Sequence, residues 1–134
     1  MVSLIRGNRG QSVVEFALVL PLLLMILFGI TEFGRAWMTS NILTSAAREG
    51  ARLAVVTAPD VDRVKTRVKT VCAAAGILVG DGDITVTGPN PADPDRRVTV
   101  SVRSNFEVLS GTVLKPFSGS IPLRATSVMR HESI

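Results

Sequence analysis

The sequence has one cysteine, one histidine and no tyrosine. The lone cysteine, Cys72, excludes an internal disulfide and any CxxC-type metal cluster. A zinc site or a histidine-dependent triad could draw only on His131, so we expect neither. The chain also lacks a glycine-rich phosphate loop, a nucleophile elbow and a pair of catalytic carboxylates. The sequence therefore predicts a protein that is not an enzyme and that needs no cofactor.

Aromatic residues make up only 4% of the chain, and the formal net charge is +4. Stacking platforms for bases need more aromatic surface, and Arg96-Arg97 is the only adjacent basic pair, so we do not expect nucleic-acid binding. The remaining candidate for a metal site is a group of acids whose glycine and proline neighbours are typical of turns and whose spacing matches no calcium loop: Asp81, Asp83, Asp93 and Asp95.

One long apolar run lies near the N-terminus, from Val13 to Ile30, with Glu15 as its single charge. Its length is close to the roughly 17–25 residues that a bilayer-spanning helix needs. We expect it to be helical, because in hydrocarbon the backbone must satisfy its own hydrogen bonds, and we expect Pro21 to kink it. The sequence thus predicts a single-pass membrane protein.

The residues that flank this run indicate its orientation. Arg6 and Arg9 precede it without any acid, whereas Glu32 and Arg35 follow it and their opposite charges cancel. This basic excess favours a cytoplasmic N-terminus and an extracytoplasmic C-terminal domain. A secretory signal peptide is the alternative, but the carboxylate of Glu15 inside the run argues against it, as does the lack of a nearby cleavage segment.

A basic leader is followed by Gly10, Gln11, then Glu15 and Phe16. This pattern resembles the prepilin-type cleavage motif of type IV pilin-like proteins. The resemblance implies that an integral-membrane aspartyl protease, the prepilin peptidase, cuts after Gly10. It also implies that Glu15 neutralises the terminal amine of an adjacent subunit. The alternative for Glu15 is a position at the membrane interface, where the positive end of the helix would favour it.

The wider segment 9–56 resembles TadE-like proteins, the pseudopilin-like components of tight-adherence (Flp) pilus systems. The residues that carry the resemblance are Arg9-Gly10-Gln11-Ser12-Val13-Val14-Glu15-Phe16, Phe28-Gly29-Ile30-Thr31-Glu32-Phe33-Gly34-Arg35-Ala36-Trp37 and Ala46-Ala47-Arg48-Glu49-Gly50-Ala51-Arg52. It implies a minor pilin or pseudopilin-like role in pilus assembly. The implied partners are a TadF-like pseudopilin, the pilus inner-membrane platform, the lipid bilayer, and either the major pilin or copies of the chain itself. The residues that it points to for assembly and helix packing are Glu15, Pro21, Gly29, Glu32, Gly34, Arg35, Ala47, Gly50 and Ala51.

Helical periodicity continues beyond the apolar run, with apolar residues every three or four positions as far as Ala54 and a breaker at Thr57-Ala58-Pro59. The small residues Ala46, Ala47, Gly50, Ala51 and Ala54 have two interpretations. They could let helices of different subunits approach closely, or they could pack against the chain's own domain, which we favour. We expect Arg48, Glu49 and Arg52 to pair along a solvated face.

The rest of the chain predicts a small α+β domain. Asp60 to Gly76 has the caps and the apolar stripe of a helix, with Cys72 on the stripe as a buried thiol. Alternation predicts strands over 83–87, 97–103 and 121–129, a turn over 90–95, and a connection from Phe106 to Phe117 that could hold a short helix. The expected fold is a pilin-like α+β arrangement: a long N-terminal transmembrane helix, a second helix and a roughly three-stranded antiparallel sheet.

These expectations divide the chain into a leader (1–10), a transmembrane helix (11–31), its extramembrane continuation (32–57) and an extracytoplasmic domain (58–134). The predicted location is the cytoplasmic (inner) membrane, with incorporation into a pilus left open. Two functions fit. The first is a processed component of pilus assembly, and the second is an unprocessed, membrane-anchored scaffold or binding domain of a secretion apparatus.

Overall fold

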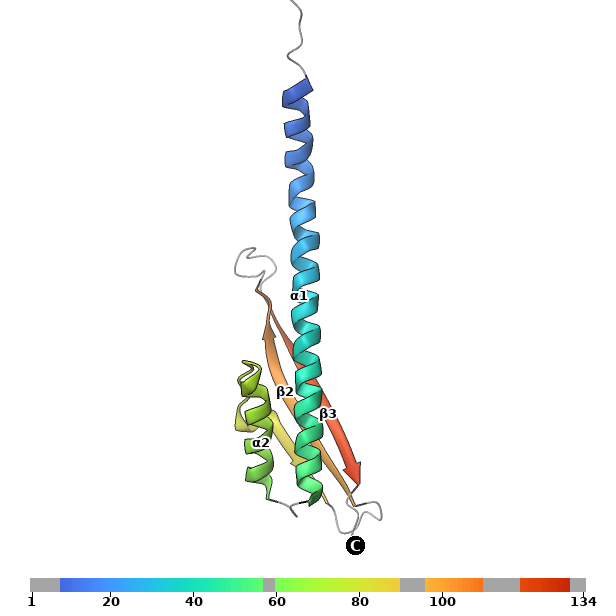
Figure 1. Cartoon of the computed structure of the whole chain (residues 1–134), viewed down its shortest axis with the longest axis vertical. Helices are drawn as coiled ribbons and strands as arrows, with labels where there is room; N and C mark the ends of the chain where they lie inside the picture. Colours follow the sequence, from blue (N-terminus) through green and yellow to red (C-terminus); the bar gives the residue numbers. More distant parts are fainter. Residues whose placement is uncertain (1–7, 57–59, 90–95, 110–118, 131–134) are drawn as a thin grey trace, which may run out of the picture. The chain divides into compact units, whose positions relative to one another are not determined.

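A computed structural model describes residues 8–56, 60–89, 96–109 and 119–130 of the chain. Within them the order of elements is α1, α2, a short 3-10 turn, β1, β2 and β3 (Figure 1). The predicted α+β fold, with a long apolar N-terminal helix, a second helix and an antiparallel sheet, is confirmed. The chain forms two compact units, Met1–Gly34 and Arg35–Ile134, which are described separately below.

The helix α1 spans Asn8–Val56 and includes Pro21. Its part in the first unit presents large apolar side chains that no other described residue covers. Phe16, Leu18 and Leu22, for example, are 60%, 75% and 60% exposed. A helix that is apolar on all sides is typical of a membrane span or of a helix that other helices surround. The first unit therefore has the uncovered apolar surface of a candidate membrane span.

In the second unit, α1 carries small side chains and becomes buried. Ala46, Ala47 and Ala51 are fully buried, and Leu43 between them and the unit boundary is buried too. At Gly50, α1 lies close to both α2 and β2. A Cβ atom there would lie 2.6 Å from Val68 Cγ2 and 3.3 Å from Val100 Cγ1. The small residues thus pack against α2 and the sheet of the same chain, which is the interpretation favoured above.

The second helix, α2, spans Val61–Ala74. It begins where the sequence predicts, because Asp60 Oδ1 accepts a hydrogen bond from the Arg63 backbone N–H at 3.1 Å. It ends before Gly76, whose φ of 76° is the left-handed conformation that glycine adopts most readily. Val64, Val68 and Cys72 lie on its buried face. The predicted helix and its thiol on the apolar stripe are confirmed.

The sheet contains β1 (Ile84–Thr87), β2 (Arg97–Glu107) and β3 (Ser120–Arg130), in that spatial order and antiparallel throughout. The β2–β3 register pairs Val102 with Ala125, and both are buried. All three strands were predicted, although the interpretation of Phe106 and Glu107 as part of a connection was wrong. The structure places them in β2, paired with Ile121 and Ser120. The predicted turn over 90–95 and most of the predicted connection lie outside the described residues.

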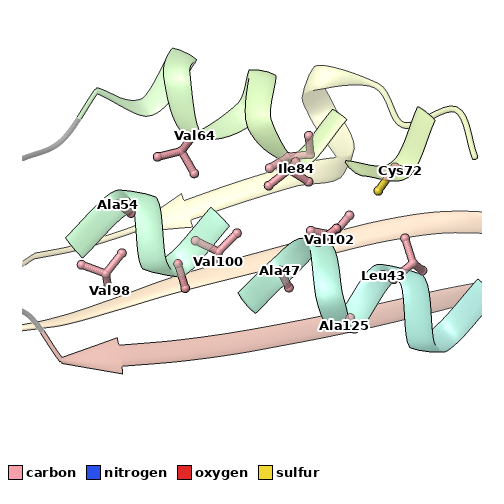
Figure 2. Close-up of a cluster of buried hydrophobic side chains, with 13 residues drawn as sticks. Leu43, Ala47, Ala54, Val64, Cys72, Ile84, Val98, Val100, Val102 and Ala125 are labelled. Atoms are coloured by element: carbon pink, nitrogen blue, oxygen red, sulfur yellow. The ribbon is translucent and has the colours of Figure 1, made fainter. Parts of the chain in front are cut away.

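The core of the second unit is made mostly of valine and alanine side chains. Figure 2 shows them between the two helices and the sheet. Val98, Val100 and Val102 point from β2 toward the helices and are fully buried. The alternating residues of β2 form the opposite face, where Ser101 and Thr126 share a hydrogen bond of 3.0 Å between their hydroxyl groups. The helices therefore cover one face of the sheet, as the period-2 pattern of β2 requires.

The close packing of α2 and β2 against Gly50 predicts that a methyl group at this position destabilises the domain. Gly50→Ala would force the side chains of Val68 and Val100 to move in a closely packed core, which costs about 1–3 kcal/mol of unfolding free energy. Denaturant unfolding of the full chain in detergent, followed by circular dichroism, measures this loss.

Gly34→Ala is the matched control, because nothing lies within 4 Å of a Cβ at Gly34. Alanine is the better helix former, by about 0.5–1 kcal/mol, so this variant should be neutral or more stable. Equal effects of the two substitutions would contradict the packing described here.

The burial of Cys72 predicts an unreactive thiol and a dependence of stability on alkaline pH. Burial raises the pKa of Cys72 above its ordinary value of 9.0, because the thiolate is poorly solvated in the core. Its contribution to stability is complete below pH 9.0 and is lost as the pH rises through the folded-state pKa. Alkylation at neutral pH should be roughly tenfold or more slower in the folded chain than in the unfolded chain. Similar rates would show that the thiol is accessible.

Candidate processing and assembly site

The four residues of the predicted cleavage motif lie in the first turns of α1, within the first unit. Gly10, Gln11 and Glu15 are exposed, and Phe16 is 60% exposed. Gln11 and Glu15 are four residues apart and so share one face of the helix. The Gln11 side-chain amide donates a hydrogen bond of 3.3 Å to Glu15 Oε1. The carboxylate therefore lies beside the residue that would become the new N-terminus after a cut at Gly10.

The position of Glu15 relative to the helix start matters for its electrostatics. The helix begins at Asn8, and no acid occupies its first turn. The positive potential at a helix N-terminus is strongest within the first turn, so Glu15 gains little from it in the uncut chain. Removal of the residues before Gln11 would place Glu15 close to the new helix start. A cut at Gly10 would move this carboxylate from the eighth to the fifth position of the helix, just beyond its first turn.

The apolar surface behind the motif is long and uncovered. One helix of the described residues, Gly10–Val56, is long and apolar enough by length and composition to cross a membrane. Its most apolar window of 18 residues has a mean hydropathy of 2.7, and the chain buries none of it. A buried core helix of a soluble domain would be mostly covered instead. The exposed large apolar side chains of this part include Val13, Leu18, Val19, Leu22, Leu23 and Ile26.

The other predicted assembly residues of the first unit occupy different environments. Pro21 lies within the helix, and neither Gly29 nor Gly34 has an atom within 4 Å of an added Cβ. Both glycines leave space at the helix surface that a second helix could approach. Glu32 lies between them on the same helix.

Arg35 begins the second unit and contacts its sheet. Its guanidinium carbon lies 5.0 Å from the centroid of the Phe106 ring, a cation–π arrangement. The first residue of this unit is therefore held against β2 of the same domain. Sequence spacing gave no signal of this contact, because 71 positions separate the two residues.

Ala47, Gly50 and Ala51 belong to the domain core and not to an open helix surface. Ala47 and Ala51 have no exposed area, and Gly50 lies against Val68 and Val100. In this fold these three residues serve helix packing within the chain, so a second subunit would have to contact α1 elsewhere.

Two exposed ion pairs link α2 to its neighbours. Glu49 accepts from Arg67 of α2 at 3.0 Å, so this pair joins the two helices, whereas the sequence predicted pairing along α1. Lys69 Nζ lies 2.6 Å from Asp81 Oδ1. The hydrogen bond from Lys69 and its charge lower the pKa of Asp81. Both pairs join α2 to neighbouring elements, and at such exposure they contribute little to stability.

The acids give no metal site among the described residues. No group of three or more histidine, cysteine or acidic side chains in this part of the chain could hold an ion. Asp81 is instead engaged with Lys69. Asp93, Asp95 and His131 lie outside the residues that the structure describes.

Two shallow hollows of the second unit were not expected from the sequence. The first, of about 460 Å³, lies between α1 and the end of α2 and is lined by Trp37, Met38, Asn41, Ile42, Val71 and Ala75, among others. The second, of about 430 Å³, is lined by Arg35, Thr39, Ala75, Leu78, Phe106 and Glu107, among others. Both depend on a tertiary arrangement that brings the turn after α2 beside α1, which no local pattern encodes.

Comparison with known proteins found a similarity in one segment of the chain. The family model of the TadE-like protein matches residues 10–52, which confirms the resemblance to this family over that segment. Comparison with curated proteins and with solved structures gave no match. The matched segment contains the motif, the apolar helix and the buried small residues. It points to involvement in a tight-adherence pilus system and, together with the apolar helix, to a membrane-anchored protein.

Proposed function

We propose that this chain is a minor pilin or pseudopilin-like component required for assembly of tight-adherence (Flp, type IVb-like) pili. In this proposal a prepilin peptidase cuts after Gly10, and the mature protein acts through helix–helix packing in the membrane. The observation that carries the proposal is the exposed carboxylate of Glu15, the fifth residue after the proposed cut, on an uncovered apolar helix that matches the TadE-like family.

The charge balance at the proposed new N-terminus supports this role. A cut after Gly10 creates an ammonium group on Gln11, next to the face that carries Glu15. Four residues correspond to about 6 Å along the helix, within reach of an extended side chain. An isolated carboxylate costs about 2.5–3.5 kcal/mol at the centre of a membrane helix, so pairing with an ammonium group favours insertion. The same pair can form between neighbouring subunits, which would set their stagger.

The surface of the first unit supports a partner in the membrane. Helices associate in bilayers where small residues allow close approach, and Gly29 and Gly34 are open in this way. The proposed partners are copies of this chain, the major pilin, a TadF-like pseudopilin and the inner-membrane platform of the pilus. Arg6 and Arg9 favour a cytoplasmic N-terminus, so the second unit would be extracytoplasmic, on the outer side of the cytoplasmic membrane.

The second unit is a small folded domain that two competing proposals could use. Its described residues form a small core covered by two helices, without a metal-binding group. The competing proposal is an unprocessed, membrane-anchored scaffold of a secretion apparatus, which needs the apolar helix but not the cut. Whether the chain is cut after Gly10 therefore distinguishes the two proposals.

Processing predicts a defined new N-terminus. On co-expression with a prepilin peptidase, the mature chain should begin at Gln11, as read by mass spectrometry of the N-terminal peptide. Gly10→Leu should abolish this shortening, because the side chain obstructs the residue at the cut. An intact leader in the unaltered chain would favour the unprocessed scaffold.

Gly29→Ala serves as the matched control, since it changes a glycine of the same helix that has open space around it. This variant should be shortened to the same extent as the unaltered chain. If it also resisted shortening, the effect of Gly10→Leu would reflect a damaged helix and not a blocked cut.

Assembly predicts a requirement for the charge of Glu15. Glu15→Gln keeps the shape of the side chain but removes the partner of an ammonium group. If the ion pair contributes about 1.4 kcal/mol or more to subunit association, pilus number should fall roughly tenfold or more. Electron microscopy of complemented cells counts the pili, and immunoblotting of membranes checks that the variant is present.

Glu107→Gln is the corresponding control, because Glu107 is an exposed acid of β2 in the second unit. It should leave pilus number unchanged. Normal piliation with Glu15→Gln, at normal protein levels, would remove the proposed role of this carboxylate.

A further inference from the structure

Three large apolar side chains lie exposed at one end of the second unit. Trp37 and Met38 of α1 are 63% and 62% exposed, and Leu78 in the turn after α2 is 90% exposed. Trp37 and Met38 line the first hollow, Leu78 lines the second, and Ala75 lines both. The three side chains, called the apolar rim below, therefore belong to one continuous region of the surface.

The path of α2 puts this rim at the end of the domain where α1 enters it. Val68 packs at Gly50, whereas Ala75 lies beside the turn that carries Trp37. α2 thus runs back along α1 toward Arg35, the first residue of the second unit. Figure 1 shows the two helices side by side over this stretch. Leu78 follows α2 and shares the second hollow with Arg35 and Thr39.

Chain length puts the rim close to the predicted membrane span. The span is predicted to end at Thr31, and Trp37 follows six residues later, so at most about 20 Å of chain separates the two residues, whatever path it takes. The headgroup layer on each side of the hydrocarbon core is about 5–8 Å thick. The indole of Trp37 can therefore reach the headgroup layer.

The chemistry of the rim fits that layer. Tryptophan is enriched at membrane–water interfaces because its ring is apolar and its N–H is polar. Arginine places its aliphatic stem along apolar surface and its charge in the polar zone, and Arg35 lies in the same region. A leucine that is 90% exposed gains from any apolar neighbour.

We propose that the apolar rim contacts the headgroup region of the bilayer that α1 spans, so that the second unit is seated on the membrane surface. This inference rests on the proposed membrane anchoring and goes beyond it, because a span alone leaves the domain without contact to lipid. Lipid is the occupant that continuity in the chain favours, since Trp37 and Met38 follow the predicted span by a few residues and Leu78 shares their region of the surface.

The chain offers a direct reporter, because Trp37 is its only tryptophan. The full-length protein is reconstituted into vesicles of phosphatidylcholine and phosphatidylglycerol that contain lipids brominated near the headgroup or deep in the acyl chain. Bromine quenches tryptophan fluorescence only at short range. Lipids brominated near the headgroup should quench Trp37 strongly, and lipids brominated deep in the chain should quench it weakly.

Leu78→Asp tests whether the rim acts as a unit. It places a charge at an exposed position outside the core, so the fold should persist, as circular dichroism checks. The charge disfavours contact with the apolar part of the interface, and we expect quenching by the shallow bromines to fall by roughly half. Val128→Asp is the matched control, because Val128 is 54% exposed on β3 and lines neither hollow. It should leave the quenching unchanged.

Flotation of the vesicles separates the two possible failures. A chain that floats with the vesicles while Trp37 is not quenched by lipid overturns the seating of the domain and leaves the anchoring intact. A chain that does not float overturns the anchoring and, with it, this inference. Shielding of Trp37 that appears only at high protein-to-lipid ratio would identify a second copy as the occupant and would also overturn the lipid contact.

Discussion

The domain depends on the absence of a side chain at Gly50. This one position brings α1 against both α2 and β2, because Val68 and Val100 occupy the space that a Cβ would need. The alanines around it are fully buried for the same reason, whereas the large apolar residues earlier in the helix are exposed. One continuous helix therefore has two kinds of partner: the chain's own domain in one part and an apolar environment outside the chain in the other.

This division of α1 determines what a cut at Gly10 could change. The first core residue of the domain is Leu43, and no buried residue of the described chain precedes it. Removal of the leader would therefore leave every core contact in place. It would alter only the charges near the start of α1, a part of the helix that contributes no residue to the core. Processing and folding are thus separable in this chain, and a folded domain can exist before and after a cut.

The sequence predicted the elements whose residues alternate or repeat, and it failed where the pattern was interrupted. Val98, Val100 and Val102 predicted β2 because apolar and polar residues alternate in this stretch of the sequence. Ser104 breaks that apolar alternation, so the buried Phe106 two positions later was read as part of a connection. The motif at Gly10 and Glu15 is local and could be found in the sequence. The contact of Arg35 with Phe106, the pair of Glu49 with Arg67 and both hollows could not, because each joins residues that are distant in the chain.

The proposed ion pair gives a physical reason why an acid is tolerated in a membrane helix. An unpaired carboxylate at this depth would oppose insertion, and an unpaired ammonium group at the same end would too. Together they carry no net charge, so a helix with both can leave contact with lipid for contact with other helices at little electrostatic cost. If the pair forms between subunits, the ammonium group of each new subunit binds the Glu15 carboxylate of its neighbour in place of its own. The stagger between neighbours then follows from the four-residue spacing of Gln11 and Glu15.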